Sequence, residues 1–169
     1  YDLADGLGVA MGLHEFFRQC DLVTGACYAQ TVNVIGCIKT TKTAAFMETT
    51  GLVLEYYRRY FGMHPLPLNL EGSSLDVVAA VDENQDTLTV AAVNPTRGPL
   101  PFSLESEFSG LPLDFEKGWV LTGEEAEATN TATQPSQIQW DSWTEPVSEP
   151  LNFPALSVAL LRFQISALS

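Results

Sequence analysis

Residues 28–35 read Tyr-Ala-Gln-Thr-Val-Asn-Val-Ile and end a run of small and β-branched residues that covers 21–35. A run of this composition, flanked by turn residues, is typical of a buried strand. Apolar residues recur at helical spacing over 3–17 before this strand and over 44–61 after it. These two patterns predict amphipathic helices. The order of elements over residues 1–62 is therefore expected to be helix, buried strand, helix.

A single strand leaves unpaired backbone groups along both of its sides. Helix, strand, helix is one slice of an α/β architecture, and such a slice cannot close a sheet alone. We therefore expect the strand at 21–35 to pair with neighbours that lie outside this chain.

The pattern changes to short runs separated by turn residues from residue 66 onward, and alternation is clearest over 87–93. Several short strands at this spacing predict an antiparallel sandwich. The predicted strands cover 66–70, 75–81, 87–94, 100–106, 118–122, 137–140 and 157–165. Residues 124–136 are polar and acidic, which indicates a surface loop.

Charge and composition limit the classes of partner. The chain of 169 residues carries 8 Lys and Arg against 21 Asp and Glu, a formal net charge of −13, so we expect neither nucleic acid nor a membrane surface as partner. Hydrophobic residues make up 46%, which suffices for a folded core. No apolar run approaches the roughly 20 residues that span a bilayer.

The chain begins at Tyr1 with an acidic segment and no initiator Met, so we expect it to be processed or truncated there, without a signal peptide. Its three cysteines, Cys20, Cys27 and Cys37, are odd in number and fit no zinc spacing. We interpret them as buried free thiols and expect no metal. Free thiols favour a reducing, cytoplasmic compartment, although a secreted form stays open.

The first half resembles the end of the catalytic barrel of glycoside hydrolase family 51. The resemblance is carried by residues 1–7 and 17–23, and above all by 28–35, which look like the family's Ala-Gln-x-Val-Asn-Val run. The second half looks like the family's C-terminal β-sandwich, with Asn130-Thr131, Pro135 and residues 154–158 in the family's order.

This resemblance implies a fold class of α/β plus all-β. Residues 1–62 would be helix 7, strand 8 and helix 8 of a (β/α)8 TIM barrel, and 66–169 an antiparallel, jelly-roll-like β-sandwich. The implied activity is retaining hydrolysis of terminal α-L-arabinofuranosyl groups from arabinan or arabinoxylan, without a cofactor. It needs two carboxyl groups about 5–5.5 Å apart. In the family these end barrel strands 4 and 7, upstream of Tyr1, so we expect no catalytic residue here and no activity from this chain alone.

Gln30 is the one site residue that the resemblance transfers to this chain. The matching glutamine of the family binds the arabinofuranose, and an amide can both donate to and accept from sugar hydroxyls. Asn33 also matches, but whether it serves the ligand or the following loop is open. The implied partners are the remainder of the barrel, an arabinose-containing glycan and further copies of the chain in a homo-oligomer.

Two other functions compete with this hypothesis. The chain could be a non-catalytic carbohydrate-binding sandwich that stacks sugars on Trp119, Trp140 or Trp143, or the same part of a family 51 endoglucanase. The remaining polar residues are interpreted structurally, as solvated, ion-paired or core groups, and the acidic run 124–127 lacks the ligand spacing of a calcium loop. This interpretation covers His14, His64, Glu15, Glu48 and Glu55.

Overall fold

A computed structural model describes residues 1–68, 73–104, 110, 112–147 and 150–166. Helix α1 (Leu3–Arg18) is followed by strands β1 (Ile38–Thr40) and β2 (Ala45–Met47) and by helix α2 (Thr49–Tyr60). The strands that follow are β3 (His64–Leu66), β4 (Asp76–Val81), β5 (Thr87–Asn94), β6 (Leu100–Phe102), β7 (Leu113–Thr122), β8 (Trp140–Ser142), β9 (Leu151–Phe153) and β10 (Ser157–Ile165).

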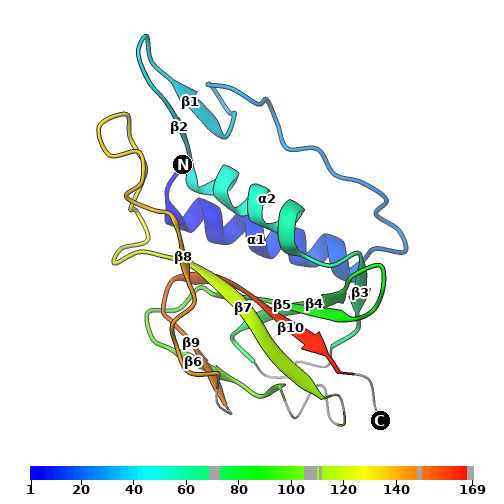
Figure 1. Ribbon diagram of the computed structural model, residues 1–169. Helices are drawn as coiled ribbons and strands as arrows, with labels where there is room; N and C mark the ends of the chain where they lie inside the picture. Colours follow the sequence, from blue (N-terminus) through cyan, green and yellow to red (C-terminus); the bar gives the residue numbers. More distant parts are fainter. Residues whose placement is uncertain (69–72, 105–109, 111, 148–149, 167–169) are drawn as a thin grey trace.

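Six of these strands form one antiparallel sheet in the order β3-β4-β5-β10-β7-β8, and β6 pairs with β9 in a separate two-stranded sheet. Helices α1 and α2 lie side by side on one face of the large sheet (Figure 1). The other face packs against the β6–β9 pair. Neither helix in the described ranges is long and apolar enough to cross a bilayer.

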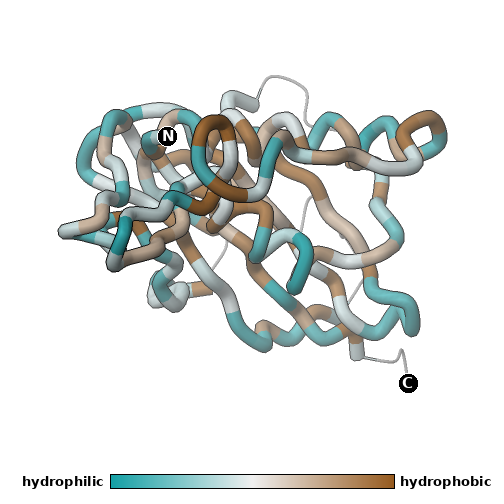
Figure 2. The backbone as a smooth tube through the Cα atoms, turned by 90° about the horizontal axis from the view of Figure 1, so that it is seen from above, coloured by the Kyte–Doolittle hydropathy of each residue, from teal (hydrophilic) through white to brown (hydrophobic). Residues whose placement is uncertain are grey.

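Strand β5 shows why this sheet is stable. All eight of its residues are buried, so both faces of the strand lie in a core. Leu88 and Val90 belong to the core beneath β6–β9, whereas Ala91 and Val93 belong to the core beneath the helices. Because side chains alternate along a strand, the apolar run over 88–93 supplies both cores. Figure 2 shows hydrophobic segments along the middle of the molecule.

Most of the predicted strands are confirmed, with shifted bounds. The strand expected at 118–122 is longer, since β7 spans Leu113–Thr122, and the one expected at 137–140 lies at Trp140–Ser142. The strand expected at 100–106 is shorter, and β3 shares only Leu66 with the strand expected at 66–70; residues 69–70 and 105–106 lie outside the described residues. Strand β9 was not predicted, and the loop at 124–136 contains no named strand.

The sandwich prediction holds only in part. The described second sheet has two strands, and helices rather than strands cover the opposite face of the large sheet. The division of the chain into a barrel segment over 1–62 and a sandwich over 66–169 stays a prediction.

The buried strand predicted over 21–35 is wrong for the chain by itself. These residues form an irregular, mostly exposed segment that arches away from the helices, with one isolated bridge from Val32 to Ile38 (Figure 1). The physical reason is the lack of neighbouring strands, which the sequence analysis predicts for this segment. Among the described residues only the first residue of β1, Ile38, bonds to the backbone of this segment, at Thr31 and Asn33, so most of its backbone groups have no strand partner, and an unpaired strand is unstable.

The start of the second helix was also predicted wrongly. Helix α2 begins at Thr49 rather than near Ala44, and residues 45–47 pair with 38–40 in a hairpin. The hairpin forms because Thr41 closes a tight turn: its Oγ1 accepts from the backbone N–H of Ala44 at 3.0 Å. Side chains of this kind stabilise turns at the expense of helix.

Identifiable residues mark the start of α1 and the end of α2. Asp2 caps α1, and a reciprocal bond from the Asp2 backbone N–H to Asp5 completes a capping box. Gly62 follows α2, but close packing rather than a left-handed backbone requires glycine there. A Cβ at Gly62 would lie 2.6 Å from the carbonyl oxygen of Val81.

A buried polar cluster joins both helices to β4. His14 on α1 is fully buried, and its Nε2 lies 2.5 Å from the hydroxyl of Tyr57 on α2. Its Nδ1 lies 3.3 Å from a carboxylate oxygen of Asp76, which also accepts a hydrogen bond from Arg18. Because a carboxylate only accepts, we assign the proton of neutral His14 to Nδ1, so that Nε2 accepts from Tyr57. His14 therefore has the structural role expected for it.

Protonation in this cluster follows from burial and charge. Burial lowers the pKa of His14 and raises that of Tyr57 well above its ordinary value, so both groups stay neutral. Burial pushes the pKa of Asp76 upward, but the contacts of its carboxylate with His14 and with the Arg18 guanidinium outweigh burial and the net pKa is lowered. The cluster is therefore a carboxylate–guanidinium pair with a neutral imidazole beside it.

We expect Gly62→Ala to destabilise the protein by about 1–3 kcal/mol, because the methyl group would push against backbone rather than against a movable side chain. Chemical denaturation would measure this change. Gly98→Ala is the matched control, since a Cβ at Gly98 meets nothing within 4 Å. Equal stability of the two variants would contradict the close-packing explanation.

We expect the folded protein to lose stability as the pH falls below about 6.5, the ordinary pKa of histidine, because the unfolded state takes up the His14 proton more readily. Asp76, whose pKa is also lowered, adds to the loss below about pH 4. Thermal unfolding between pH 7.5 and 5 should show a smaller pH dependence for His14→Gln than for the unaltered protein. Equal slopes for the variant and the unaltered protein would refute the role of His14.

Candidate functional site

Gln30 lies in the exposed segment between α1 and β1, with its side chain open to solvent. The backbone around it is unusual: Ala29, Asn33 and Val34 have φ angles of 28°, 55° and 45°. Left-handed backbone is costly for residues other than glycine, above all for a β-branched one. This strain gathers where the sequence predicts the ligand-binding residue.

Asn33 is tied to the loop that follows it. Its Oδ1 accepts from the backbone N–H of Thr40 at 2.8 Å, and its Nδ2 donates to the Thr40 hydroxyl at 2.8 Å. Its own backbone N–H donates to the carbonyl of Ile38 at 2.8 Å. In this structure Asn33 therefore holds the base of the β1–β2 hairpin, which is one of the two roles left open for it.

Aromatic and charged groups surround the segment that carries Gln30. The rings of Tyr1 and Tyr28 meet edge to face, with centroids 6.5 Å apart. Lys39 lies 5.1 Å from the centroid of the Tyr1 ring and donates to the carbonyl of Val34 at 2.9 Å. The buried carboxylate of Glu48 lies 3.8 Å from Lys39. Gln30 thus stands close in sequence to a well-connected group of side chains.

The other glutamates of the helices make local ion pairs, as expected. Glu15 lies 3.5 Å from Arg18, and Glu55 lies 2.8 Å from Arg59. His64 is exposed in β3. Among the described residues none of these side chains contacts Gln30, so they add nothing to the site.

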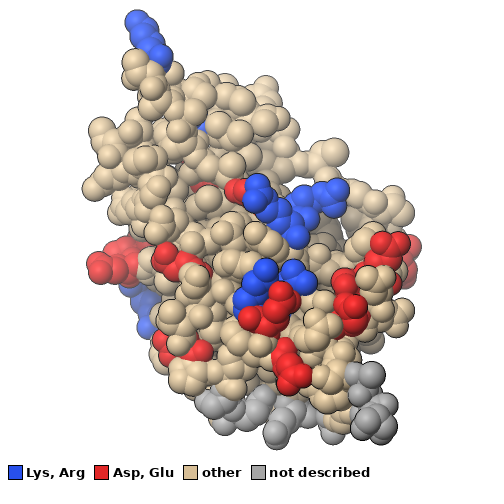
Figure 3. All heavy atoms as spheres, viewed as in Figure 1, with Lys and Arg blue, Asp and Glu red and all other residues tan. Residues whose placement is uncertain are grey.

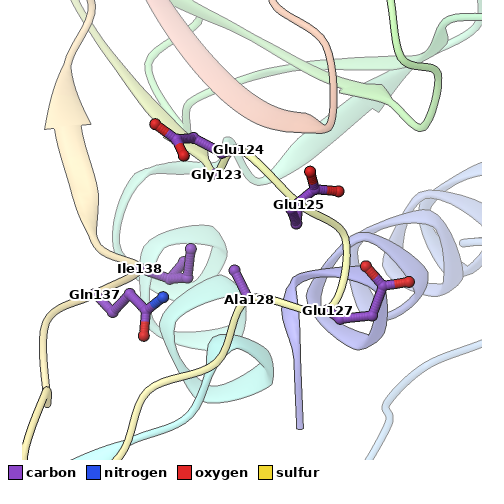
Figure 4. Close-up of a pocket in the computed structure, with 7 residues that line it drawn as sticks. All are labelled: Gly123, Glu124, Glu125, Glu127, Ala128, Gln137 and Ile138. Carbon is purple, nitrogen blue, oxygen red and sulfur yellow. The ribbon is translucent and has the colours of Figure 1, made fainter.

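A hollow of about 650 Å³ lies beside the acidic loop after β7. Its lining includes Glu124, Glu125, Glu127 and Gln137, and Figure 4 shows the three carboxylates pointing in different directions. Among the described residues no group of three or more His, Cys, Asp or Glu is placed to hold a metal ion. Diverging carboxylates do not form a cation site, and the loop stays a surface loop.

The tryptophans belong to packed interfaces. Trp143 is 7% exposed in the core beneath β6–β9. Trp140 stacks on Tyr56 with centroids 4.5 Å apart, and Trp119 stacks on Tyr60 at 4.1 Å. The indole N–H of Trp140 donates to the carbonyl of Leu52 at 2.9 Å. Because α2 covers these rings, they join helix to sheet rather than offer open faces to a sugar.

The cysteines are free, but the expectation that they are buried is wrong. Cys20 and Cys27 are exposed and Cys37 is half-buried. The two exposed cysteines lie at the start and in the middle of the irregular segment that follows α1.

The family model for the α-L-arabinofuranosidase C-terminal domain matches residues 1–157. The chain belongs to this family. It is 28% identical to the probable α-L-arabinofuranosidase C of Aspergillus flavus over 186 residues, which cover 97% of this chain and 35% of that protein. It is 30% identical over 151 residues to an intracellular exo-α-(1→5)-L-arabinofuranosidase of Streptomyces lividans, covering 82% of this chain and 22% of that enzyme.

Solved structures of α-L-arabinofuranosidases share the fold. The enzyme of Thermotoga maritima, solved as an arabinose complex, has a TM-score of 0.81 at 23% identity, over 98% of this chain and 39% of that one. The family 51 enzyme of Bifidobacterium longum has a TM-score of 0.78 at 24% identity, over 97% and 35%. The predicted membership in family 51 is therefore confirmed, and the chain spans about a third of the length of the first curated relatives.

If the tryptophans are structural in this arabinofuranosidase domain, Trp143→Ala should destabilise the protein by about 3–5 kcal/mol, the usual cost of removing a large buried ring. Urea denaturation measures the loss. Trp143→Phe should keep most of the stability and leave affinity for arabinan unchanged in affinity electrophoresis. A Phe variant that stays folded but no longer binds arabinan would favour the binding-module hypothesis instead.

Proposed function

We propose that this chain forms the strand-8 side of the sugar pocket, together with the β-sandwich, of a retaining family 51 α-L-arabinofuranosidase. The catalytic acid/base and nucleophile would come from barrel residues outside this chain. The observation that carries the proposal is the largely unpaired segment 21–37 in a chain of this family.

This segment has the surface of an element that lacks its neighbours. Leu22 is 75% exposed, Val34 81% and Ile35 51%. Exposed apolar groups in one stretch mark an interaction surface. If the rest of a barrel supplies strands on both sides, the segment gains backbone partners and these side chains become buried, which removes the two physical defects of the isolated chain together.

The chemistry of the pocket would then be divided between this chain and the remainder of the barrel. The helix glutamates of this chain are engaged in ion pairs, and those of the acidic loop diverge. We therefore assign neither carboxylate role to them. Within the described residues the Gln30 side chain makes no intramolecular hydrogen bond, and it would bind sugar hydroxyls, since its amide supplies two donors and one acceptor oxygen.

The proposed substrate is a terminal α-L-arabinofuranosyl group on arabinan or arabinoxylan. The name of the Streptomyces lividans relative specifies an exo-acting α-(1→5)-arabinofuranosidase, and the Thermotoga maritima structure is an arabinose complex. Both proteins agree with a pocket for one terminal sugar. Assembly into a homo-oligomer is part of the same proposal.

The test is hydrolysis of 4-nitrophenyl α-L-arabinofuranoside by the native protein that contains this chain. We expect Gln30→Ala to lower kcat/KM about 5- to 150-fold, because hydrogen bonds worth about 1–3 kcal/mol to the sugar are lost. Gln134→Ala, at an exposed glutamine of the acidic loop, should change nothing.

Two results would overturn these assignments separately. Unchanged kinetics of Gln30→Ala would refute the site residue while leaving the activity intact. Absence of arabinofuranosidase activity in the unaltered native protein, with cleavage of cello-oligosaccharides instead, would replace the proposed function by that of an endoglucanase.

A further inference from the structure

The β1–β2 hairpin projects from the molecule, and none of residues 38–47 belongs to either hydrophobic core of the described structure. It leaves the body of the molecule above α2 and connects the segment that carries Gln30 to that helix (Figure 1). In a barrel, the connection from a strand to the following helix lies on the face that holds the active site. The hairpin occupies this connection after the proposed strand 8.

The base of the hairpin is tied to the residues next to Gln30. Ile38 donates its backbone N–H to the carbonyl of Thr31 at 3.1 Å and accepts from Asn33 at 2.8 Å. Two residues farther along β1, Thr40 makes two hydrogen bonds with the side chain of Asn33. The position of the hairpin is therefore set by the same short stretch that positions Gln30.

The other side of the hairpin is held by α2 and by the sandwich. The backbone N–H of Glu48 donates to the carbonyl of Cys37 at 2.8 Å. Asn130, buried in the loop after β7, donates to the carbonyl of Met47 at 3.0 Å and to that of Ile138 at 2.9 Å. Attachment on both sides keeps the hairpin from swinging freely, so its tip has a defined place.

The tip presents polar groups that the rest of the chain does not use. The Thr41 side chain is engaged within the turn, where its hydroxyl oxygen accepts hydrogen bonds from the backbone N–H groups of Thr43 and Ala44. Lys42 and Thr43 are exposed, and within the described ranges no ion pair involves Lys42. Figure 3 shows a cationic (blue) group at the far end of the projection, with no acidic group beside it on that face. An unpaired cation is conspicuous in a chain with 21 acidic residues.

We propose that the β1–β2 hairpin is the wall of the pocket on the leaving-group side, where Lys42 and Thr43 donate hydrogen bonds to hydroxyls of the glycan that carries the terminal arabinofuranose. This inference rests on the proposed function. A terminal sugar fills the pocket of an exo-acting enzyme, so a structure at the rim reaches only the remainder of the substrate. An ammonium with three donors and a hydroxyl suit the vicinal hydroxyls of a sugar chain.

The test compares two substrates on the native protein: 4-nitrophenyl α-L-arabinofuranoside, which has no glycan leaving group, and linear α-(1→5)-arabinotriose. For the double variant Lys42→Met with Thr43→Val, we expect the ratio of kcat/KM on arabinotriose to that on the aryl glycoside to fall about 3- to 30-fold. Methionine and valine keep the apolar stems while removing the donors. Arg58→Met, at an exposed cation on α2, should leave the ratio unchanged.

An unchanged ratio in the double variant, with thermal unfolding that shows it folded, would overturn the inference. Equal losses on both substrates would also overturn it, because the tip would then act on the pocket rather than on the leaving group. If the double variant does not fold, the single variant Lys42→Met is measured and judged by the same ratio. Lack of any arabinofuranosidase activity in the unaltered protein would instead refute the proposed function and this inference with it.

Discussion

The pairing of β5 with β10 is the contact on which the rest of the structure depends. Eight residue pairs join these strands, from Ser157 opposite Asn94 to Gln164 opposite Thr87. Each strand then pairs on its other side, β5 with β4 and β10 with β7, so the sheet grows outward from this centre. Because both faces of the pair are buried, the helices and the β6–β9 sheet can each pack on it, and the register of one ladder determines where every other element lies.

The sheet was largely predictable because its signal is local. Alternation over 87–93 and the turn residues on either side are properties of a few neighbouring residues, and the strand at Thr87–Asn94 follows from them. Strand β9 was missed because Leu151–Phe153 is only three residues long and lies between prolines. The hairpin was missed for another reason: the apolar residues of 44–47 also fit a helix, and the turn bonds of Thr41 decided between the two.

The candidate site was less accessible to sequence reasoning. The tie between Asn33 and Thr40 joins residues whose partnership neither spacing nor composition indicates. The strand predicted at 21–35 failed because its composition describes a buried environment that this chain does not provide. Gln30 could be selected only through resemblance to a family, since a lone polar residue in an apolar run has no chemical signature of its own.

The buried side chain of Asn130 links the loop after β7 to the β1–β2 hairpin. One buried amide bonds both to the strand that ends the hairpin, through Met47, and to the sandwich loop, through Ile138. The hairpin and the loop after β7 are therefore held together by one buried side chain. Any exchange of the strands after α2 with those of a relative would also replace Asn130, and with it the side chain that anchors the end of the hairpin.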